Sequence, residues 1–251
     1  MEQQIKLDPQ VLSILQDKIQ RIDTEYDSIY LVGPIQLPVN LGGKTTLFHW
    51  YCWWNYEEVT EDYEAIIAKL SSANLAEYQQ SSVLVYGDFA TADHALVRMH
   101  SICHTGDIFG SKRCDCGFQL REAMERIKEN GSGALFYLAN HEGRGIGLFS
   151  KAMAYILQEN GYDTVEANER LGFVNDSRNY QNALHVLKKL RQKPVTVITN
   201  NPEKLVAFKE AEISINGRTP LWGDVSEYNR KYLQTKVNKS GHFQPEGAPL
   251  R

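Results

Sequence analysis

The sequence is poor in the features that would place it in a membrane, in an oxidising compartment or on a nucleic acid. Its 251 residues include four cysteines, and no apolar run approaches the length of a membrane span. The polar start MEQQIKLDPQ does not resemble a signal peptide. A net charge of −4 at pH 7 does not indicate a broad nucleic-acid-binding face. We therefore expect a cytoplasmic protein with no membrane or nucleic-acid partner, in which clustered cysteines indicate a metal or catalysis rather than disulfides.

The composition is that of a folded globular protein. Hydrophobic residues make up 42% of the chain and charged residues 23%, as is ordinary for a globular protein. The chain length suits either one large domain or a core domain with an added segment. From residue 82 onward, segments with strand character alternate with amphipathic helical segments. This alternation predicts an α/β fold with a mixed β-sheet flanked by helices.

The first third of the chain has a different pattern. Residues 7–29 are expected to form one helix, since Asp8 can cap it, Pro9 fits its first turn and apolar residues recur at helical spacing. The segment PIQLPVNLGGK then breaks the pattern near residue 33. Aromatic residues on both faces of TTLFHWYCWWNY predict a strand buried on both sides, or covered on one side by a partner chain. The expected domains are an N-terminal helical extension over residues 1–33, a main domain over 34–242 and a flexible tail over 243–251.

Three of the four cysteines lie close together in the sequence. Cys103 precedes Cys114 by eleven residues, and Cys116 follows Cys114 by two. A strand end and a short turn could bring the three thiols to one point as a zinc-binding loop. Structural zinc sites usually have four protein ligands, whereas catalytic sites keep one position for water.

Two other interpretations stay open on spacing alone. A structural zinc site would need a fourth ligand, for which His100, His104 and Cys52 are candidates. Buried cysteines without a metal are the second alternative, although the charged residues beside them make a poor apolar core.

Basic residues occur in motifs that could meet around an anionic ligand. Arg144 belongs to NHEGRGIGLFSK, a glycine-rich link that matches neither a P-loop nor G-x-G-x-x-G. Arg178 follows Asp176 in NDSRNY, and Lys204 follows a strand end in TNNPEK. With Arg98 they could form the basic island that an acidic protein needs to hold phosphates. Each motif alone also fits helix capping and solvated charge.

In combination, these motifs resemble a known family. VRMHSICHTGDIFGSKRCDCGFQL, HEGRGIGL, GYDTVEANERLGF, NDSRNY, TNNPEK and YLQTKVNKSGH are similar, in the same order, to motifs of GTP cyclohydrolase II. The resemblance covers roughly residues 82–242, with a weaker echo from about residue 36. It implies a zinc-dependent hydrolase that opens the imidazole ring of GTP and releases formate and pyrophosphate. The product would be a 2,5-diamino-6-ribosylamino-pyrimidinone 5'-phosphate for riboflavin synthesis.

The resemblance also implies roles for individual residues. Asp176 matches the proton acceptor, Arg178 the proposed nucleophile towards the α-phosphate, and Tyr155 the tyrosine implicated in ring opening. The positions that match the zinc ligands are Cys103, Cys114 and Cys116. The positions that match nucleotide-binding residues are Arg98, Gln119, Glu142, Gly143, Arg144, Thr164, Thr199 and Lys204. One Zn²⁺ per chain, Mg²⁺ with the triphosphate and a homodimer are further implications.

Two positions depart from the family pattern. Ile102 stands where an acidic residue usually precedes the first zinc cysteine, and His141 stands where a glutamine is usual before Glu-Gly-Arg. These differences leave two alternatives to the full reaction. One is a non-catalytic GTP-binding zinc protein with a regulatory role, and the other is a paralogue that stops at the formamidopyrimidine in another pathway.

The carboxylate missing at Ile102 generates a first prediction. Beside a metal and a triphosphate, such a charge could orient a basic residue or hold Mg²⁺. We expect Ile102→Glu to change the rate of formate release or the nucleotide preference, while zinc content stays the same because all three cysteines remain. Steady-state kinetics on GTP and ATP, with metal analysis of both proteins, check this. Kinetics identical to wild type on both nucleotides would show that the missing charge has no role.

Overall fold

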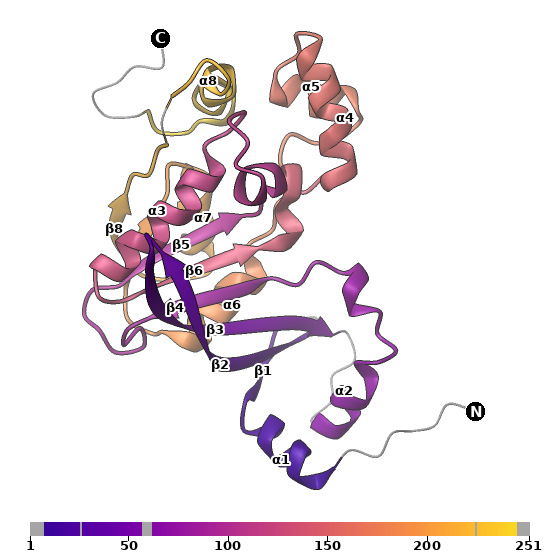
Figure 1. The fold of residues 1–251 in the computed structure, drawn as a ribbon, viewed down its shortest axis with the longest axis vertical. Coiled ribbons are helices and arrows are strands. Elements are labelled where there is room, and N and C mark those ends of the chain that lie inside the picture. The colour runs from indigo at the N-terminus through magenta and orange to yellow at the C-terminus, as the bar shows by residue number, and fades with distance from the viewer. Residues whose placement is uncertain (1–7, 26, 57–61, 224, 245–251) are drawn as a thin grey trace.

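A computed structural model describes residues 8–25, 27–56, 62–223 and 225–244 of the chain. Within these ranges, one mixed sheet carries helices on both faces (Figure 1). Its strands are β1 (Ile19–Asp23), β2 (Ser28–Leu41), β3 (Lys44–Tyr56), β4 (Ser82–Tyr86), β5 (Leu96–Ser101), β6 (Gly133–Leu138), β7 (Val195–Ile198) and β8 (Ile215–Thr219). They lie in the order β1-β2-β3-β4-β6-β5-β7-β8. Pairing is antiparallel from β1 through β6 and parallel from β6 through β8, so the expected α/β class is confirmed.

The helices fall into two groups by length. The α-helices are α1 (Pro9–Gln16), α2 (Tyr63–Lys69), α3 (Cys116–Glu129), α4 (Leu148–Glu159), α5 (Thr164–Arg170), α6 (Gln181–Leu190), α7 (Pro202–Glu210) and α8 (Arg230–Ser240). The shorter turns are the 3₁₀ segments η1 (Leu75–Glu77) and η3 (Ala139–Arg144) and the π-helix η2 (His104–Ile108). Among the described residues, every helix is too short or too polar to cross a bilayer.

The core has two layers because residues of each strand alternate between the faces of the sheet. In β6, Ala134 and Phe136 belong to the buried cluster that α6 and α7 cover. Leu135 belongs to the other cluster, which α3 covers with Ala123 and Ile127. This period of two fixes the register of β6 between the layers.

The N-terminal helix is shorter than the sequence predicts. Only α1 is helical, and β1 pairs antiparallel with β2 in place of the helix expected up to residue 29. No residue of α1 is buried, whereas Ile29 and Leu31 are fully buried in β2. Strand pairing next to this buried strand outweighs the helical spacing of the apolar residues. The expected break near residue 33 lies inside β2, where the register shifts between Val32 and Ile35.

The aromatic strand prediction is confirmed in β3. Phe48 is buried in one layer of the core and Trp53 in the other. The remaining aromatic residues of β3 are partly exposed. The proposed division into domains at residues 33 and 242 stays a prediction, and most of the expected C-terminal tail lies outside the described residues.

The topology places several loops at one edge of the sheet. Because β5, β6 and β7 are parallel, their carboxyl ends lie together. The segment η2 follows β5, η3 follows β6, and the loop before α7 follows β7. Beyond this edge lie α4, α5 and α8 (Figure 1). Ligands of α/β sheets bind at such edges.

Arg191, at the end of α6, generates a prediction about stability. Its guanidinium is buried and donates to the carbonyls of Phe89, Ala92, Lys193 and Pro194, so it joins the end of α6 and the residues after it to the segment 89–92. We expect Arg191→Met to lower the free energy of unfolding by about 3 kcal/mol, since one buried and three part-buried carbonyls lose a charged donor.

Urea unfolding measures this change in stability. Lys189→Met removes a charge from an exposed position of the same helix and serves as the control. Equal stability of the two variants would contradict a structural role for Arg191.

Candidate active site

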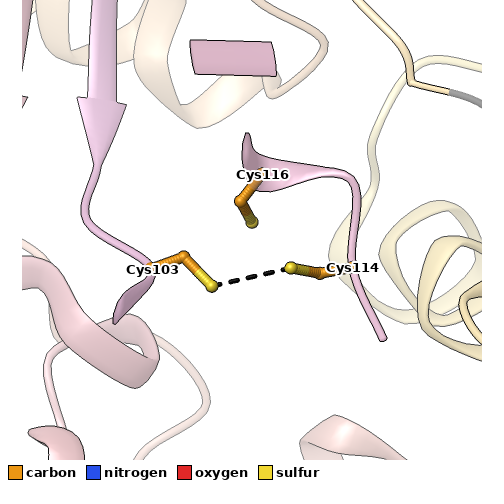
Figure 2. Close-up of side chains that lie close together, drawn as sticks. All are labelled: Cys103, Cys114 and Cys116. Carbon is orange, nitrogen blue, oxygen red and sulfur yellow. Dashed lines mark hydrogen bonds between the residues drawn. The ribbon is translucent and has the colours of Figure 1, made fainter. Parts of the chain in front are cut away.

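The three clustered cysteines converge at the carboxyl end of β5. Cys103 follows that strand, Cys114 lies two residues before α3, and Cys116 is the first residue of α3. Their sulfur atoms all lie within 4.8 Å of one another, and the Sγ atoms of Cys103 and Cys114 are 3.6 Å apart (Figure 2). Three thiols at this spacing are a donor set that suits zinc. The residues present therefore fit a zinc ion.

None of the candidate fourth ligands joins this cluster in the part of the chain that the structure describes. The Nε2 atom of His100 lies 3.1 Å from Asp107 Oδ2, and the ring of His104 packs edge-on against a neighbouring aromatic ring. The Cys52 thiol donates to the Ser81 carbonyl at 3.6 Å. Among the described residues, the cluster therefore offers three protein ligands, the number that leaves one tetrahedral position for water.

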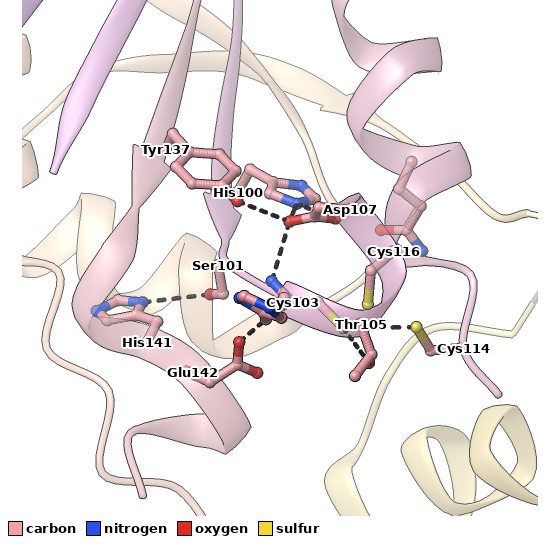
Figure 3. A network of polar contacts seen from close by, with 12 residues as sticks. His100, Ser101, Cys103, Thr105, Asp107, Cys114, Cys116, Tyr137, His141 and Glu142 are labelled. Carbon is pink, nitrogen blue, oxygen red and sulfur yellow. Dashed lines mark hydrogen bonds and ion pairs between the residues drawn. The ribbon is translucent and has the colours of Figure 1, made fainter. Parts of the chain in front are cut away.

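A buried carboxylate fixes the loop that carries Cys103. Asp107 Oδ2 accepts a hydrogen bond from the Cys103 N–H at 2.9 Å and another from the Tyr137 hydroxyl at 3.1 Å (Figure 3). Burial lowers the pKa of His100, so a neutral imidazole donates to the same carboxylate through Nε2. These contacts turn the chain through η2 and place the Cys103 thiol beside the other two.

Gly106 lies directly against the cysteine cluster. A Cβ atom at this position would lie 2.8 Å from Cys114 Sγ and 3.1 Å from Cys103 Sγ. At Gly117, a Cβ atom would lie 2.3 Å from the Gly106 carbonyl oxygen. Glycine at both positions therefore allows the two loops to approach closely enough for the thiols to meet.

Lys151 and Glu142 form a buried ion pair next to Cys103. The Lys151 Nζ atom lies 2.6 Å from Glu142 Oε1 and 3.2 Å from Cys103 Sγ. Although burial opposes its charge, the neighbouring Cys103, Tyr155 and Glu142 raise the pKa of Lys151. The other oxygen of Glu142 accepts from the His104 N–H at 2.7 Å (Figure 3). Glu142 thus lines the cavity, but each of its carboxylate oxygens has a partner within the protein. These contacts position the loop that carries Cys103.

The side chain of Thr105 lies between the Tyr155 hydroxyl and the sulfur atom of Cys103. Its hydroxyl is 3.2 Å from Thr105 Oγ1, which is 3.7 Å from Cys103 Sγ. Burial raises the pKa of Tyr155, so the phenol keeps its proton at neutral pH. The ring is covered by the guanidinium of Arg113, 4.3 Å from the ring centroid. A neutral hydroxyl here is placed to donate a proton beside the metal site.

One cavity joins the cysteine cluster to the basic residues. Apart from Asp176, every site residue predicted from the sequence contributes to its wall. These residues are Arg98, Cys103, Cys114, Cys116, Gln119, Glu142, Gly143, Arg144, Tyr155, Thr164, Arg178, Thr199 and Lys204. Thr164 is the first residue of α5. The Thr199 hydroxyl accepts a hydrogen bond from the Asn201 N–H at 3.0 Å within the loop before α7.

Asp176 lies just outside this wall and holds Arg178. It accepts from the Arg178 Nε at 2.8 Å and also from one terminal nitrogen. The other terminal nitrogen of Arg178 donates to Ser101 Oγ at 3.2 Å. Ser101 lies 3.2 Å from His141 Nδ1, and His141 Nε2 lies 2.8 Å from the Asn179 carbonyl. Burial lowers the pKa of His141 to about 4, so its neutral ring donates to Asn179 and accepts from Ser101.

The glycine-rich link docks onto the loop that carries Arg178. Gly143, Arg144 and Gly145 all have positive φ, and a Cβ atom at Gly145 would lie 2.4 Å from Ser177 Oγ. The Ser177 N–H donates to the Arg144 carbonyl at 3.1 Å, and the Arg144 guanidinium bonds the Asn175 side chain. The left-handed backbone at Arg144 thus places this guanidinium in the cavity wall beside Arg178.

The surroundings of Lys204 show that the positive charges of the cavity wall lie close together. It is buried, and its Nζ donates to the Met99 carbonyl at 2.6 Å. Burial and the charges of Arg98, Arg178 and Lys236 lower the pKa of Lys204 well below its ordinary value. The cavity therefore repels further cations and favours an anionic ligand.

Sequence reasoning missed residues that support the site and residues that line its cavity. Asp107 and Tyr137 support the zinc loop from below, and Trp222, Tyr232 and Lys236 come from the C-terminal part of the chain. Tyr137 lies in a hydrophobic strand pattern, and Asp107 lies in a loop without a recognisable acid–base spacing. The motif YLQTKVNKSGH was a signal for the C-terminal helix, but it carries no metal or catalytic pattern.

Comparison with known proteins gives a family match for the middle of the chain. Residues 69–220 match the family described as GTP cyclohydrolase II. The riboflavin biosynthesis protein RibBA of Bacillus cereus is 48% identical to this chain over 171 residues, and that of Bacillus subtilis is 49% identical over 171 residues. Each of these matches covers 68% of this chain and 43% of the relative. The matched segment thus spans less than half the length of these curated relatives.

Gly106 generates a prediction about the metal site. We expect Gly106→Ala to reduce the bound zinc to less than about half of the wild-type content, because the added methyl group displaces the thiols from one another. Gly217→Ala is the control, since a Cβ atom there meets no atom within 4 Å. Zinc per chain, determined by mass spectrometry of the purified proteins, is the measurement. Full zinc content in Gly106→Ala would mean that the loops can separate without losing the site.

Proposed function

The chain belongs to the GTP cyclohydrolase II family, and we propose that it is an active, zinc-dependent hydrolase of GTP. The reaction would open the guanine imidazole ring with water, release carbon 8 as formate and release pyrophosphate from the triphosphate. The product would be a 2,5-diamino-6-ribosylamino-pyrimidinone 5'-phosphate. The name of the Bacillus relatives supports a place in riboflavin biosynthesis.

The observation that supports this proposal is that one cavity contains both a metal-binding cysteine cluster and a group of basic residues. A three-thiol metal site without a fourth protein ligand among the described residues lies in one wall. Arg98, Arg178 and Lys204 lie in the same cavity and are all buried or nearly so. A nucleotide with a ring to hydrolyse and a chain of phosphates needs both features. A zinc-stabilised binding protein would have no use for an open ligand position.

The residues around the cysteines support ring opening. When bound, zinc on the three thiolates supplies Lewis acidity, which makes water an effective nucleophile near neutral pH. Tyr155 keeps its proton and can give it to the ring nitrogen that departs when the carbon–nitrogen bond breaks. The Lys151–Glu142 pair holds the wall beside Cys103 and keeps this region electrically balanced.

Arg178 and Asp176 support chemistry at the phosphates. Although burial opposes its charge, Tyr180 and Asp176 hold the pKa of Arg178 above its ordinary value. A guanidinium that stays protonated is a poor nucleophile. We therefore assign Arg178 to stabilising the charge that develops on the phosphates, with Asp176 orienting it. The resemblance to the family is the support for Asp176 as a proton acceptor.

Two parts of the proposal rest on the resemblance to the family. Mg²⁺ would bind the triphosphate, where it neutralises oxygens that the basic residues do not contact. A homodimer is the proposed assembly.

Incubation of the purified protein with GTP, Zn²⁺ and Mg²⁺ tests the proposed function. We expect equal amounts of formate and the diaminopyrimidinone, identified by mass, together with pyrophosphate. Binding of GTP without formate release would favour the regulatory alternative. Accumulation of a formamidopyrimidine would favour a paralogue that stops after the first hydrolysis.

The position of Arg178 generates a prediction that separates the two chemistries. We expect Arg178→Ala to slow pyrophosphate release at least about 100-fold, because one preorganised cation is lost from the transition state. Formate release should persist, since no residue of the cysteine cluster is changed.

Both products are followed in the same reaction mixture. Arg121→Ala, on the exposed face of α3, controls for the loss of one positive charge. Unchanged pyrophosphate release by Arg178→Ala would remove Arg178 from the phosphate chemistry.

A further inference from the structure

The C-terminal helix α8 contributes a cation to the cavity. Lys236 is part of the wall, and its side chain is 13% exposed. Its Nζ lies 3.1 Å from Oδ1 of Asp115, whose side chain is completely buried. Asp115 lies between the zinc-site residues Cys114 and Cys116. One ion pair therefore connects α8 to the loop that holds the metal site.

This ion pair is the end of a row of polar contacts along the cavity wall. Asp115 Oδ2 accepts from the Gln119 side chain and from the Gly223 N–H at 3.3 Å. Gln119 Oε1 in turn accepts from the guanidinium of Arg98. The row joins two cations, Lys236 and Arg98, through a single carboxylate. Within this row a single carboxylate faces two cations, so a further anion at this part of the wall is electrostatically favourable.

Lys236 also belongs electrostatically to the same cluster as the other basic residues. Its charge helps to lower the pKa of Lys204, after burial, Arg98 and Arg178. The aromatic ring of Tyr232 covers one side of Lys236, with 4.3 Å between Nζ and the ring centroid. The ammonium group therefore faces Asp115, Tyr232 and the cavity.

We propose that Lys236 binds a phosphate of the nucleotide, so that α8 is part of the substrate site. This inference rests on the proposed function. In the ligand-free protein, Asp115 is the counter-ion of Lys236. An ammonium group has three N–H donors, so Lys236 can keep Asp115 Oδ1 as one acceptor and offer another hydrogen to a phosphate oxygen, while Asp115 Oδ2 keeps its bonds from Gln119 and Gly223.

The position of α8 does not depend on Lys236 alone. Lys239 forms ion pairs with Asp163, the N-cap residue of α5, and with Glu166 in α5. Lys231 Nζ donates to two carbonyls of the loop before α5. Loss of the Lys236 charge should therefore leave α8 in place, which lets a binding role be separated from an anchoring role.

Isothermal titration of the zinc-loaded protein with inorganic tripolyphosphate tests the proposal, because this probe contains the phosphates without the ring. We expect Lys236→Met to weaken binding about tenfold or more, as expected for loss of a charge-assisted hydrogen bond. Lys236→Arg should restore most of the affinity. Lys209→Met, at an exposed position of α7, should bind like wild type.

Asp115→Asn distinguishes a phosphate-binding lysine from a structural ion pair. If Lys236 binds phosphate, removal of its counter-ion leaves tripolyphosphate affinity equal or higher, whereas Lys236→Met lowers it. Equal losses in both variants, or wild-type affinity in Lys236→Met, would overturn the proposal. Zinc content and the melting temperature of each variant report whether the fold is kept. Formate release by the wild-type protein tests the proposed function separately. Failure of phosphate binding by Lys236 and failure of the proposed function are therefore distinguished by different measurements.

Discussion

The site depends on a buried carboxylate, that of Asp107. It accepts from the backbone of Cys103, from the Tyr137 hydroxyl and from the neutral ring of His100. These donors come from β5, β6 and the loop between β5 and α3, so the carboxylate fixes the direction in which the chain leaves the sheet. Without it, Cys103 would lose the backbone anchor that places its thiol beside the other two. The position of the Cys103 thiol in the cysteine cluster thus depends on the hydrogen bonds made by the Asp107 carboxylate.

The second constraint is the repulsion between the basic residues of the cavity, which acts against the stability of the folded protein. The chain as a whole is acidic, with a net charge of −4, but its cavity collects Arg98, Arg178, Lys204 and Lys236. Their mutual repulsion helps to hold the pKa of Lys204 well below its ordinary value. A triphosphate would relieve this repulsion by placing negative charge among the four basic residues. The repulsion among these side chains therefore favours an anionic ligand over a neutral one.

Local sequence patterns predicted most of the sheet and the cysteine cluster, for identifiable reasons. Buried strands such as β6 and capped helices such as α7 carry their own signals, and the cysteine spacing limits where three thiols can meet. The helix expected up to residue 29 failed because pairing with β2 is a long-range effect. Lys236 could not be assigned because its partner, Asp115, lies 121 residues away in the sequence. A local pattern cannot report a contact of that kind.

The two departures from the family pattern differ in their physical consequences. A neutral histidine at position 141 offers one donor and one acceptor, and it uses them on Asn179 and Ser101. A glutamine side chain also has a donor and an acceptor, so the support of Arg178 through Ser101 can survive the exchange. Ile102 lines the cavity, and its polar contact is through the backbone, to the Leu138 carbonyl. An isoleucine cannot supply the charge of a carboxylate, so of the two departures it is Ile102 that changes the electrostatics next to the metal site.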